Sequence, residues 1–211
     1  MSAGSRYARG WRWPSGWRAT TRRCPRWPAR SATWRSTRSS WPATAPRYLL
    51  DPDEDQDECE RMSERFGVPF ATATVAIMEA IGHLGVEEVH IVSPYQPWLT
   101  ELAERFWKAA GMRIAGVVPV RAQGGFSPYD ITPSELVDQV KQADLPVDAV
   151  LLFACSGMAT LPVLGTLGAG NDRTLLTSNL CSAWWALSRA TGRPVTLNRP
   201  PSRAAAHGRA S

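Results

Sequence analysis

Residues 147–155 form an apolar run, Val-Asp-Ala-Val-Leu-Leu-Phe-Ala-Cys, that ends abruptly in Ser156 and Gly157. A short apolar run bounded by turn residues is typical of a buried strand in a parallel sheet. A thiol at the carboxyl end of such a strand lies where open α/β sheets bind their ligands. We also expect a helix to begin just after the turn, and its N-terminus would lower the pKa of the thiol. The sequence therefore makes Cys155 the first candidate for a reacting group.

Strand-like and helix-like segments alternate around this run. Strands are expected over 86–93, 112–120, 147–154 and 173–178, and helices over 51–66, 74–84, 99–110, 133–145 and 180–189. Thr74 and Asn179 are expected to cap the helices that follow them. The alternation predicts βαβ units, and so an α/β fold with a parallel sheet and helices on both of its faces.

Charge is segregated along the chain. Residues 1–47 hold eleven arginines and six of the ten tryptophans, but no Asp, Glu, Lys, Leu, Ile, Val or Phe. From Asp51 to Gly192, nineteen acidic residues stand against nine basic ones. A segment without aliphatic side chains cannot build a core. Residues 1–47 and the similar tail 193–211 are therefore predicted to be disordered.

The Arg/Trp-rich segment 1–47 allows three interpretations. It is an arm that binds polyanions or an anionic membrane, since arginine neutralises phosphate and tryptophan stacks on bases. Alternatively, it is an organellar transit peptide, which is also rich in arginine and serine. The third interpretation is a GC-rich gene read out of frame, which would make the chain a truncated and inactive product. We favour the third, and so expect no nucleic-acid or membrane partner.

The four cysteines, Cys24, Cys59, Cys155 and Cys181, are widely spaced. No pair has the spacing of a zinc or redox motif. Since the sequence shows no secretory signal and no apolar run of membrane-spanning length, we expect free thiols and a cytoplasmic protein. Neither a Gly-rich phosphate loop nor a metal-ligand pattern is found, so no cofactor or metal is expected. A homo-oligomer is left open.

Five motifs follow one another along the chain: Gly67-Val-Pro, a Thr/Ala-rich helix that ends in Leu84-Gly85, Val-His-Ile-Val-Ser-Pro-Tyr95, Ala-Cys155-Ser-Gly-Met and Thr-Ser-Asn179. Together they resemble the aspartate/glutamate racemase superfamily, in the branch of the maleate cis-trans isomerases and arylmalonate decarboxylases. The resemblance covers roughly residues 48–192. It implies two similar α/β lobes that face each other across a cleft. Here the first lobe is incomplete, with a remnant at 48–85, and the second lobe with a closing C-terminal helix occupies 86–192.

The resemblance also implies a cofactor-independent enzyme that acts on a small carboxylate or dicarboxylate. Cys155 stands at the position of the catalytic cysteine of the second lobe, and Tyr95 at that of a tyrosine that binds the substrate's carboxylate. The other expected substrate-binding residues are Ser93, Ser156, Gly157 and Asn179. The facing loop of the first lobe falls near Ala43 and Thr44, where no opposing cysteine is identified.

The reactions of this family all develop charge beside a carboxylate. A thiolate can add to maleate, allow rotation and leave. A thiol can protonate the enediolate that remains after decarboxylation of an arylmalonate. Two facing thiols can racemise aspartate or glutamate. Because Cys155 is a single readable thiol, the predicted function is isomerisation of a small dicarboxylate, with decarboxylation and racemisation as alternatives.

Overall fold

The computed structural model describes residues 44–168, 173–191 and 195–197. The chain divides into two segments, Met1–Trp41 and Pro42–Ser211, and all described residues belong to the second. The Arg/Trp-rich segment before residue 44 and most of the tail after 192 lie outside the described residues. The disorder expected there, the three interpretations of segment 1–47 and the domain boundaries stay predictions.

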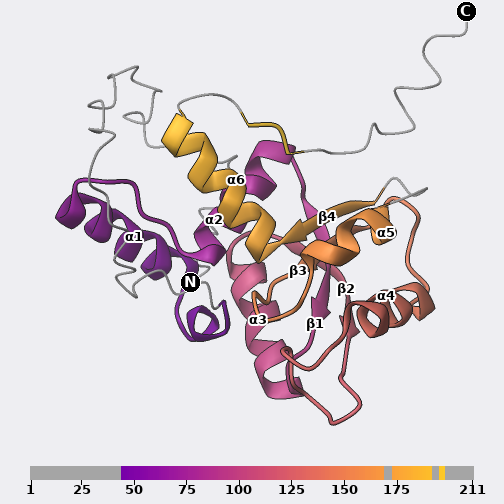
Figure 1. Ribbon diagram of the computed structural model, residues 1–211. Coiled ribbons are helices and arrows are strands. Elements are labelled where there is room, and N and C mark those ends of the chain that lie inside the picture. The colour runs from indigo at the N-terminus through magenta and orange to yellow at the C-terminus, as the bar shows by residue number, and fades with distance from the viewer. Residues whose placement is uncertain (1–43, 169–172, 192–194, 198–211) are drawn as a thin grey trace, which may run out of the picture. The chain divides into compact units, whose positions relative to one another are not determined.

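The fold is built on a four-stranded parallel sheet with the order β2-β1-β3-β4. Its strands are β1 (Glu88–Ser93), β2 (Arg113–Pro119), β3 (Val150–Phe153) and β4 (Thr174–Thr177). The predicted α/β class is confirmed. Because β1 and β3 are neighbours, the segments that follow them meet at the carboxyl edge of the sheet (Figure 1).

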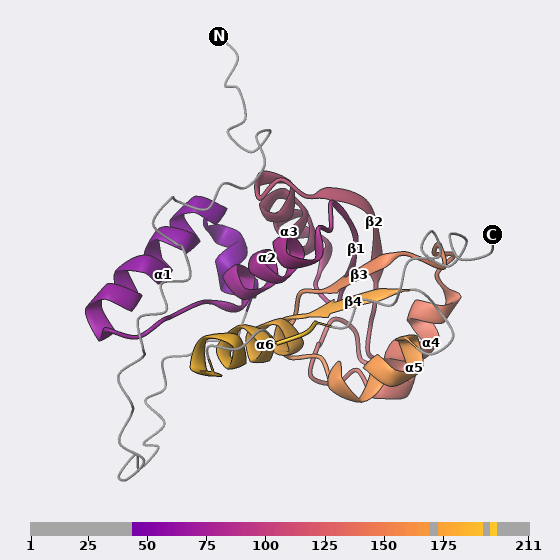
Figure 2. The ribbon, with the colours of Figure 1, turned by 90° about the horizontal axis from the view of Figure 1, so that it is seen from above.

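Helices cover both faces of the sheet, as Figure 2 shows. One side carries α2 (Ala73–Leu84), α3 (Pro97–Ala109) and α6 (Ser178–Thr191). The 3-10 helix η2 (Ala45–Leu49) and helix α1 (Pro52–Phe66) precede α2 in the chain; η2 packs against α3, and α1 against α2 and α3. The other side carries α4 (Pro133–Gln142), the 3-10 helix η3 (Leu161–Val163) and α5 (Leu164–Gly168).

The strands present alternate side chains to the two helical layers, as the pleat requires. In β3, Leu152 packs toward α2, α3 and α6, whereas Leu151 and Phe153 pack toward α4 and α5. All three side chains are fully buried. Burial on both faces explains why this strand is apolar throughout instead of alternating with polar residues.

Local sequence signals account for the ends of two helices. Asp51 and Glu54 form a reciprocal capping box at the start of α1, and Thr132 and Glu135 form another at the start of α4. Such boxes satisfy backbone N–H groups that the first helical turn leaves without partners. Gly67 ends α1 in the left-handed conformation, with φ at 65°.

Two other caps differ from the predicted ones. Helix α2 is capped by Thr72, whose hydroxyl accepts from the backbone N–H of Val75 at 3.2 Å. Helix α6 begins at Ser178, and the Thr177 hydroxyl accepts from the N–H of Leu180 at 3.0 Å. Thr74 lies inside α2, and its hydroxyl, like that of Thr72, donates to the buried carboxylate of Asp55.

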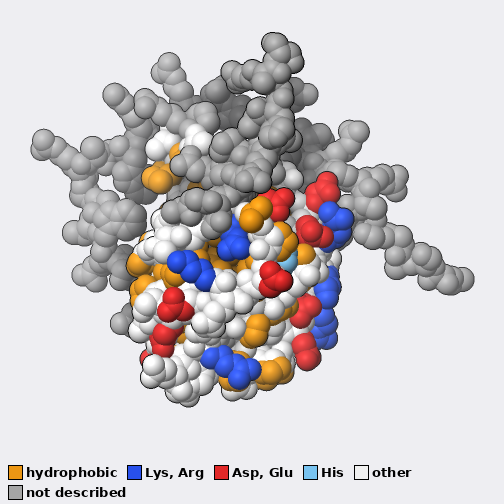
Figure 3. Space-filling model, turned by 90° about the vertical axis from the view of Figure 1, so that its right-hand side faces the viewer, with side chains coloured by type: hydrophobic (Ala, Val, Ile, Leu, Met, Phe, Trp, Pro, Cys, Tyr) orange, Lys and Arg blue, Asp and Glu red, His pale blue; other side chains and the backbone are white. Residues whose placement is uncertain are grey.

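The surface of the described part mixes both signs of charge. Acidic and basic side chains lie interspersed with apolar ones on the face drawn in Figure 3. Within the described residues, no helix combines the length and the apolar character that crossing a bilayer requires.

Candidate active site

The candidate residues gather at the carboxyl edge of the sheet. Tyr95 follows β1 by two residues, Cys155 follows β3 by two, and Asn179 lies in the first turn of α6, just after β4. Since β1, β3 and β4 are consecutive in the sheet, parallel pairing alone brings these three positions to one edge.

The backbone carbonyl of Ala154, directly before Cys155, is the centre of the polar contacts at this edge. The Tyr48 hydroxyl donates to it at 2.9 Å and the Tyr95 hydroxyl at 3.3 Å. The Thr44 hydroxyl donates to the same oxygen and also lies 3.3 Å from the Tyr95 hydroxyl. Residues from the start of the described chain are therefore tied to the loop that carries the candidate thiol.

The Cys155 thiol is buried, with 4% of the residue exposed. Burial raises the pKa of this thiol above its ordinary value, while the Tyr95 hydroxyl and the N–H groups of Gly157 and Met158 act in the opposite direction. These donors favour the thiolate because each can bond to the charged sulfur. The expectation of a lowered pKa is thus corrected, because desolvation outweighs the nearby donors.

The predicted helix directly after Cys155 is also absent from this part of the described chain. The backbone instead turns, with the Met158 N–H bonded to the Cys155 carbonyl at 3.4 Å, and η3 begins only at Leu161. The thiol therefore faces a few turn N–H groups instead of the end of a long helix dipole.

Ser156 and Gly157 form the tip of this turn. The Asn179 side-chain amide donates to the Ser156 carbonyl at 3.4 Å, which links the loop to α6. The ring of Tyr129, from the loop after β2, lies so close to Gly157 that an added Cβ would stand 2.9 Å from Cε1. Glycine at 157 therefore permits this close approach of an aromatic ring beside the candidate thiol.

Ser93 serves the turn that presents Tyr95. Its hydroxyl lies 2.7 Å from the Thr100 hydroxyl and accepts from the Tyr95 backbone N–H at 3.3 Å. The residue is buried, with 1% exposed. Substrate contact by Ser93 stays a prediction, and the contacts of the described chain give its hydroxyl a local role.

Thr44 and Tyr48 escaped the sequence-based set of site residues. Thr44 directly precedes η2 and Tyr48 lies within it, and both reach Ala154 more than a hundred residues away. The one available signal was that Tyr48 opens the first aliphatic stretch, Tyr-Leu-Leu, after the Arg/Trp-rich segment.

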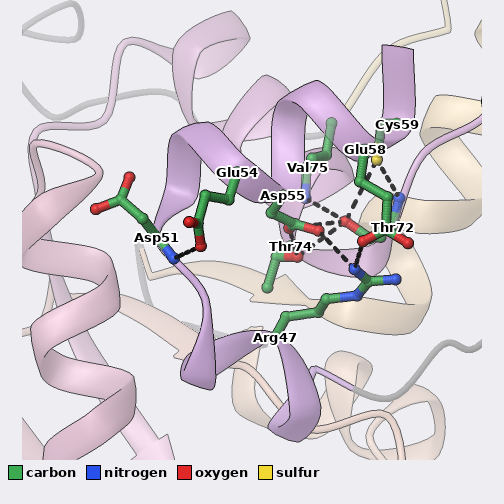
Figure 4. A network of polar contacts seen from close by, with 9 residues as sticks. All are labelled: Arg47, Asp51, Glu54, Asp55, Glu58, Cys59, Thr72, Thr74 and Val75. Carbon is green, nitrogen blue, oxygen red and sulfur yellow. Dashed lines mark hydrogen bonds and ion pairs between the residues drawn. The ribbon is translucent and has the colours of Figure 1, made fainter. Parts of the chain in front are cut away.

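A second polar network fastens η2 to α1 (Figure 4). Arg47 pairs with Glu58 and lies 3.4 Å from the carboxylate of Asp55. The Asp55 carboxylate accepts from the hydroxyls of Thr72 and Thr74. Burial raises the pKa of Asp55, although the two hydroxyls and the guanidinium favour its charged form. The turn that carries Thr44 and Tyr48 is thereby anchored from its outer side.

Within the described residues, no three His, Cys, Asp or Glu side chains lie close enough together to hold a metal ion.

Residues 52–199 match the model of the arylmalonate decarboxylase family. The chain belongs to this family. The predicted resemblance is confirmed at the level of the isomerase and decarboxylase branch. The chain is similar to the maleate isomerase of Pseudomonas putida, with 25% identity over 128 residues, which are 60% of this chain and 51% of that protein.

Solved structures of this family share the fold. The chain resembles a crystal structure of arylmalonate decarboxylase, with a TM-score of 0.62, 20% identity and coverage of 71% of this chain and 67% of the other. It also resembles a mutant maleate cis-trans isomerase of Nocardia farcinica with a covalently bound succinylcysteine intermediate, with a TM-score of 0.61, 17% identity and coverage of 71% and 63%. The chain spans only 39% to 51% of the curated maleate isomerases it matches.

Proposed function

We propose that this protein is a cofactor-independent isomerase that converts the cis form of a small dicarboxylate, maleate, into the trans form, with Cys155 as nucleophile. The observation that carries this proposal is that the Tyr95 hydroxyl, which favours the thiolate of Cys155, also lies 3.3 Å from the hydroxyl of Thr44 at the carboxyl edge of the sheet. Hydroxyl donors beside a nucleophile suit a substrate that brings a carboxylate to it.

In the proposed reaction the Cys155 thiolate adds to one carbon of the double bond. A C–S bond forms at that carbon. The electron pair of the π bond moves to the other carbon and into the carboxylate attached to it, which gives an enediolate. Rotation about the resulting single bond follows. The electron pair then reforms the double bond, the C–S bond breaks and the thiolate leaves, so the step needs no oxidant and no cofactor.

The other site residues have roles in this scheme. The Tyr95 and Thr44 hydroxyls donate to the developing enediolate, and the N–H groups around Ser156 and Gly157 add backbone donors. Asn179 holds the Ser156 carbonyl, which fixes the turn from the side of α6. Ser93 shapes the turn of Tyr95.

The comparisons support this proposal in two ways. The curated relatives that match the chain are maleate isomerases. A solved structural neighbour, the Nocardia farcinica enzyme, carries a succinylcysteine, which is the adduct that forms when a cysteine thiolate adds to maleate and the adjacent carbon takes up a proton.

A second candidate is decarboxylation of an arylmalonate, and it is favoured by the raised pKa of the Cys155 thiol. A thiol that keeps its proton at neutral pH is suited to protonate the enediolate formed when carbon dioxide leaves. The family model that matches residues 52–199 is also that of arylmalonate decarboxylase.

The test uses the purified full chain with maleate or phenylmalonate, followed by proton NMR for fumarate and phenylacetate. We expect fumarate from the wild type and none from Cys155→Ala. The matched control is Cys181→Ala, which removes another buried thiol, in α6, and is expected to keep turnover. Phenylacetate without fumarate would replace the first candidate by the second. Turnover that survives Cys155→Ala would remove the thiol from both.

A further inference from the structure

Three hydroxyl groups compete for one acceptor at the candidate site. Thr44, Tyr48 and Tyr95 all donate to the carbonyl oxygen of Ala154. A carbonyl oxygen has two lone pairs, so two donors fill it and the third is surplus. The Tyr95 contact, at 3.3 Å, is longer than that of Tyr48, at 2.9 Å, which makes Tyr95 the surplus donor.

Tyr48 is built as a fixed donor. Tyr48 is only 3% exposed, and its ring packs edge-on against the rings of Tyr95, Phe106 and Trp107, with ring centroids 5.5 to 6.3 Å apart. Burial raises the pKa of its hydroxyl well above the ordinary range, so the proton stays on the oxygen. Its hydroxyl donates to the carbonyl of Ala154, whereas the Thr44 hydroxyl and the Trp107 indole N–H act on it as donors that lower its pKa.

The Tyr95 hydroxyl has hydrogen-bond partners besides the Ala154 carbonyl. It lies 3.3 Å from that of Thr44, and it is also the side-chain donor that favours the thiolate of Cys155. A hydroxyl carries a single proton, so Tyr95 can serve the sulfur or a substrate oxygen only when it releases Ala154. That release is cheap only if another donor keeps the carbonyl satisfied, because a buried carbonyl without a partner costs free energy.

We propose that Tyr48 is a positioning residue that occupies the Ala154 carbonyl and thereby frees the Tyr95 hydroxyl for Cys155 and for the carboxylate of the substrate. This inference rests on the proposed function in taking Cys155 as the reacting thiol. It assigns to Tyr48 no contact with substrate. Loss of the Tyr48 hydroxyl opens one lone pair of Ala154, and Tyr95 fills it.

The test measures alkylation of Cys155 in the full chain by two probes of similar size, iodoacetate and neutral iodoacetamide. In each, the thiolate sulfur forms a bond to carbon while the C–I bond breaks and iodide leaves. Peptide mass spectrometry reads modification at Cys155 itself. The ratio of the two rate constants reports how well the site receives a carboxylate, and it requires no turnover of maleate.

We expect Tyr48→Phe to lower the ratio of iodoacetate to iodoacetamide by about five-fold, the change that one hydrogen bond of ordinary net strength makes. Tyr95→Phe is expected to lower it as much. The double variant should fall no further, because Tyr48 acts through Tyr95. Ile77→Val, which trims a fully buried side chain of α2, controls for a general loss of stability and should keep the ratio.

Two results would overturn the proposal. One is an unchanged ratio in Tyr48→Phe, and the other is an equal further loss when Tyr48→Phe is added to Tyr95→Phe, which a merely structural role would produce. If Tyr48→Phe does not fold, 4-fluorophenylalanine at position 48 keeps the volume without the donor and is judged by the same two results. If the protein does not turn over maleate, the proposed function is refuted, but the alkylation ratio can still be measured and still tests the role of Tyr48.

Discussion

Arg47 and Asp55 form an ion pair that joins the start of the described chain to its first long helix. Nη1 of Arg47 lies 3.4 Å from a carboxylate oxygen of Asp55, whose side chain is fully buried. Arg47 lies in η2, the same short helix that carries Tyr48. The pair therefore supports the placement of the Tyr48 hydroxyl on Ala154 as well as the packing of α1.

Removal of the guanidinium should destabilise the protein strongly. We expect Arg47→Met to lower the free energy of unfolding by about 3 kcal/mol, because the buried carboxylate of Asp55 keeps its two hydroxyl donors but loses the cation that balances its charge. Urea unfolding followed by circular dichroism measures the change. The control is Arg113→Met, a side chain 68% exposed and 3.7 Å from Glu87, which should change stability by less than about 0.5 kcal/mol. Equal losses in the two variants would contradict this account.

The Asp55 carboxyl should also give stability a dependence on pH. Burial raises its pKa in the folded state, so the folded chain holds this proton more tightly than the unfolded chain does. The resulting stabilisation is complete below the unfolded pKa of about 3.9 and is lost as pH rises through the folded pKa. We therefore expect the stability of the wild type relative to Asp55→Asn to fall as pH rises above about 4. A difference that stays constant or grows over this range would refute the sign.

A Cβ at position 157 would meet the ring of Tyr129 at 2.9 Å. Tyr129 is 81% exposed, so its ring can move aside into solvent. We expect Gly157→Ala to lower the free energy of unfolding by no more than about 1 kcal/mol, and the double variant with Tyr129→Ala to recover most of that loss. Thermal and urea unfolding of the four proteins in the cycle supply the measurement.

The matched control for this cycle is Gly165→Ala in α5, where an added Cβ would have nothing within 4 Å. Alanine favours a helix over glycine by up to about 1 kcal/mol, so this variant should be as stable as the wild type or more so. A loss at Gly157 that persists when Tyr129 is truncated would show that the ring is not the obstacle.

The sheet was predictable because its strands depend on local pattern plus parallel pairing. Tyr95 was singled out by the family resemblance, and the parallel sheet places it at the same edge as Cys155. Apolar strands bounded by turns indicate neighbours in a parallel sheet, and residues just after such strands share one edge. The capping box at Thr132 was predictable for the same reason, since its partner Glu135 is three residues away. The sheet and this capping box can each be predicted from residues close in sequence together with the fold class.

The remaining parts of the site depend on contacts that no local pattern encodes. Tyr48 bonds to the carbonyl of Ala154, 106 residues away. Thr72 and Thr74 are equivalent as helix caps by residue type, and the hydroxyls of both donate to Asp55. Thr72 is the cap because its backbone is extended and the helix begins at Ala73, which places Thr74 inside the helix. The raised pKa of Cys155 likewise follows from burial by the assembled core, which outweighs the donors that the turn supplies.

The pH dependence of turnover should separate the two candidate reactions. Because burial raises the pKa of Cys155, its thiolate is scarce at neutral pH. If the thiolate adds to maleate, kcat/KM for isomerisation should rise with pH through and above about 8.5, the ordinary thiol value. If the protonated thiol is the reactant, as in decarboxylation of phenylmalonate, kcat/KM should be flat near neutrality and fall at high pH.

Tyr95→Phe provides the internal check on this profile. The Tyr95 hydroxyl is the side-chain donor that favours the thiolate, so its loss should move the rising limb of the isomerase profile to higher pH. Alkylation of Cys155 by iodoacetamide, followed over the same pH range, should shift in the same direction without substrate. A profile for maleate that is flat between about pH 7 and pH 9 in the wild type would exclude rate-determining attack by a Cys155 thiolate of raised pKa.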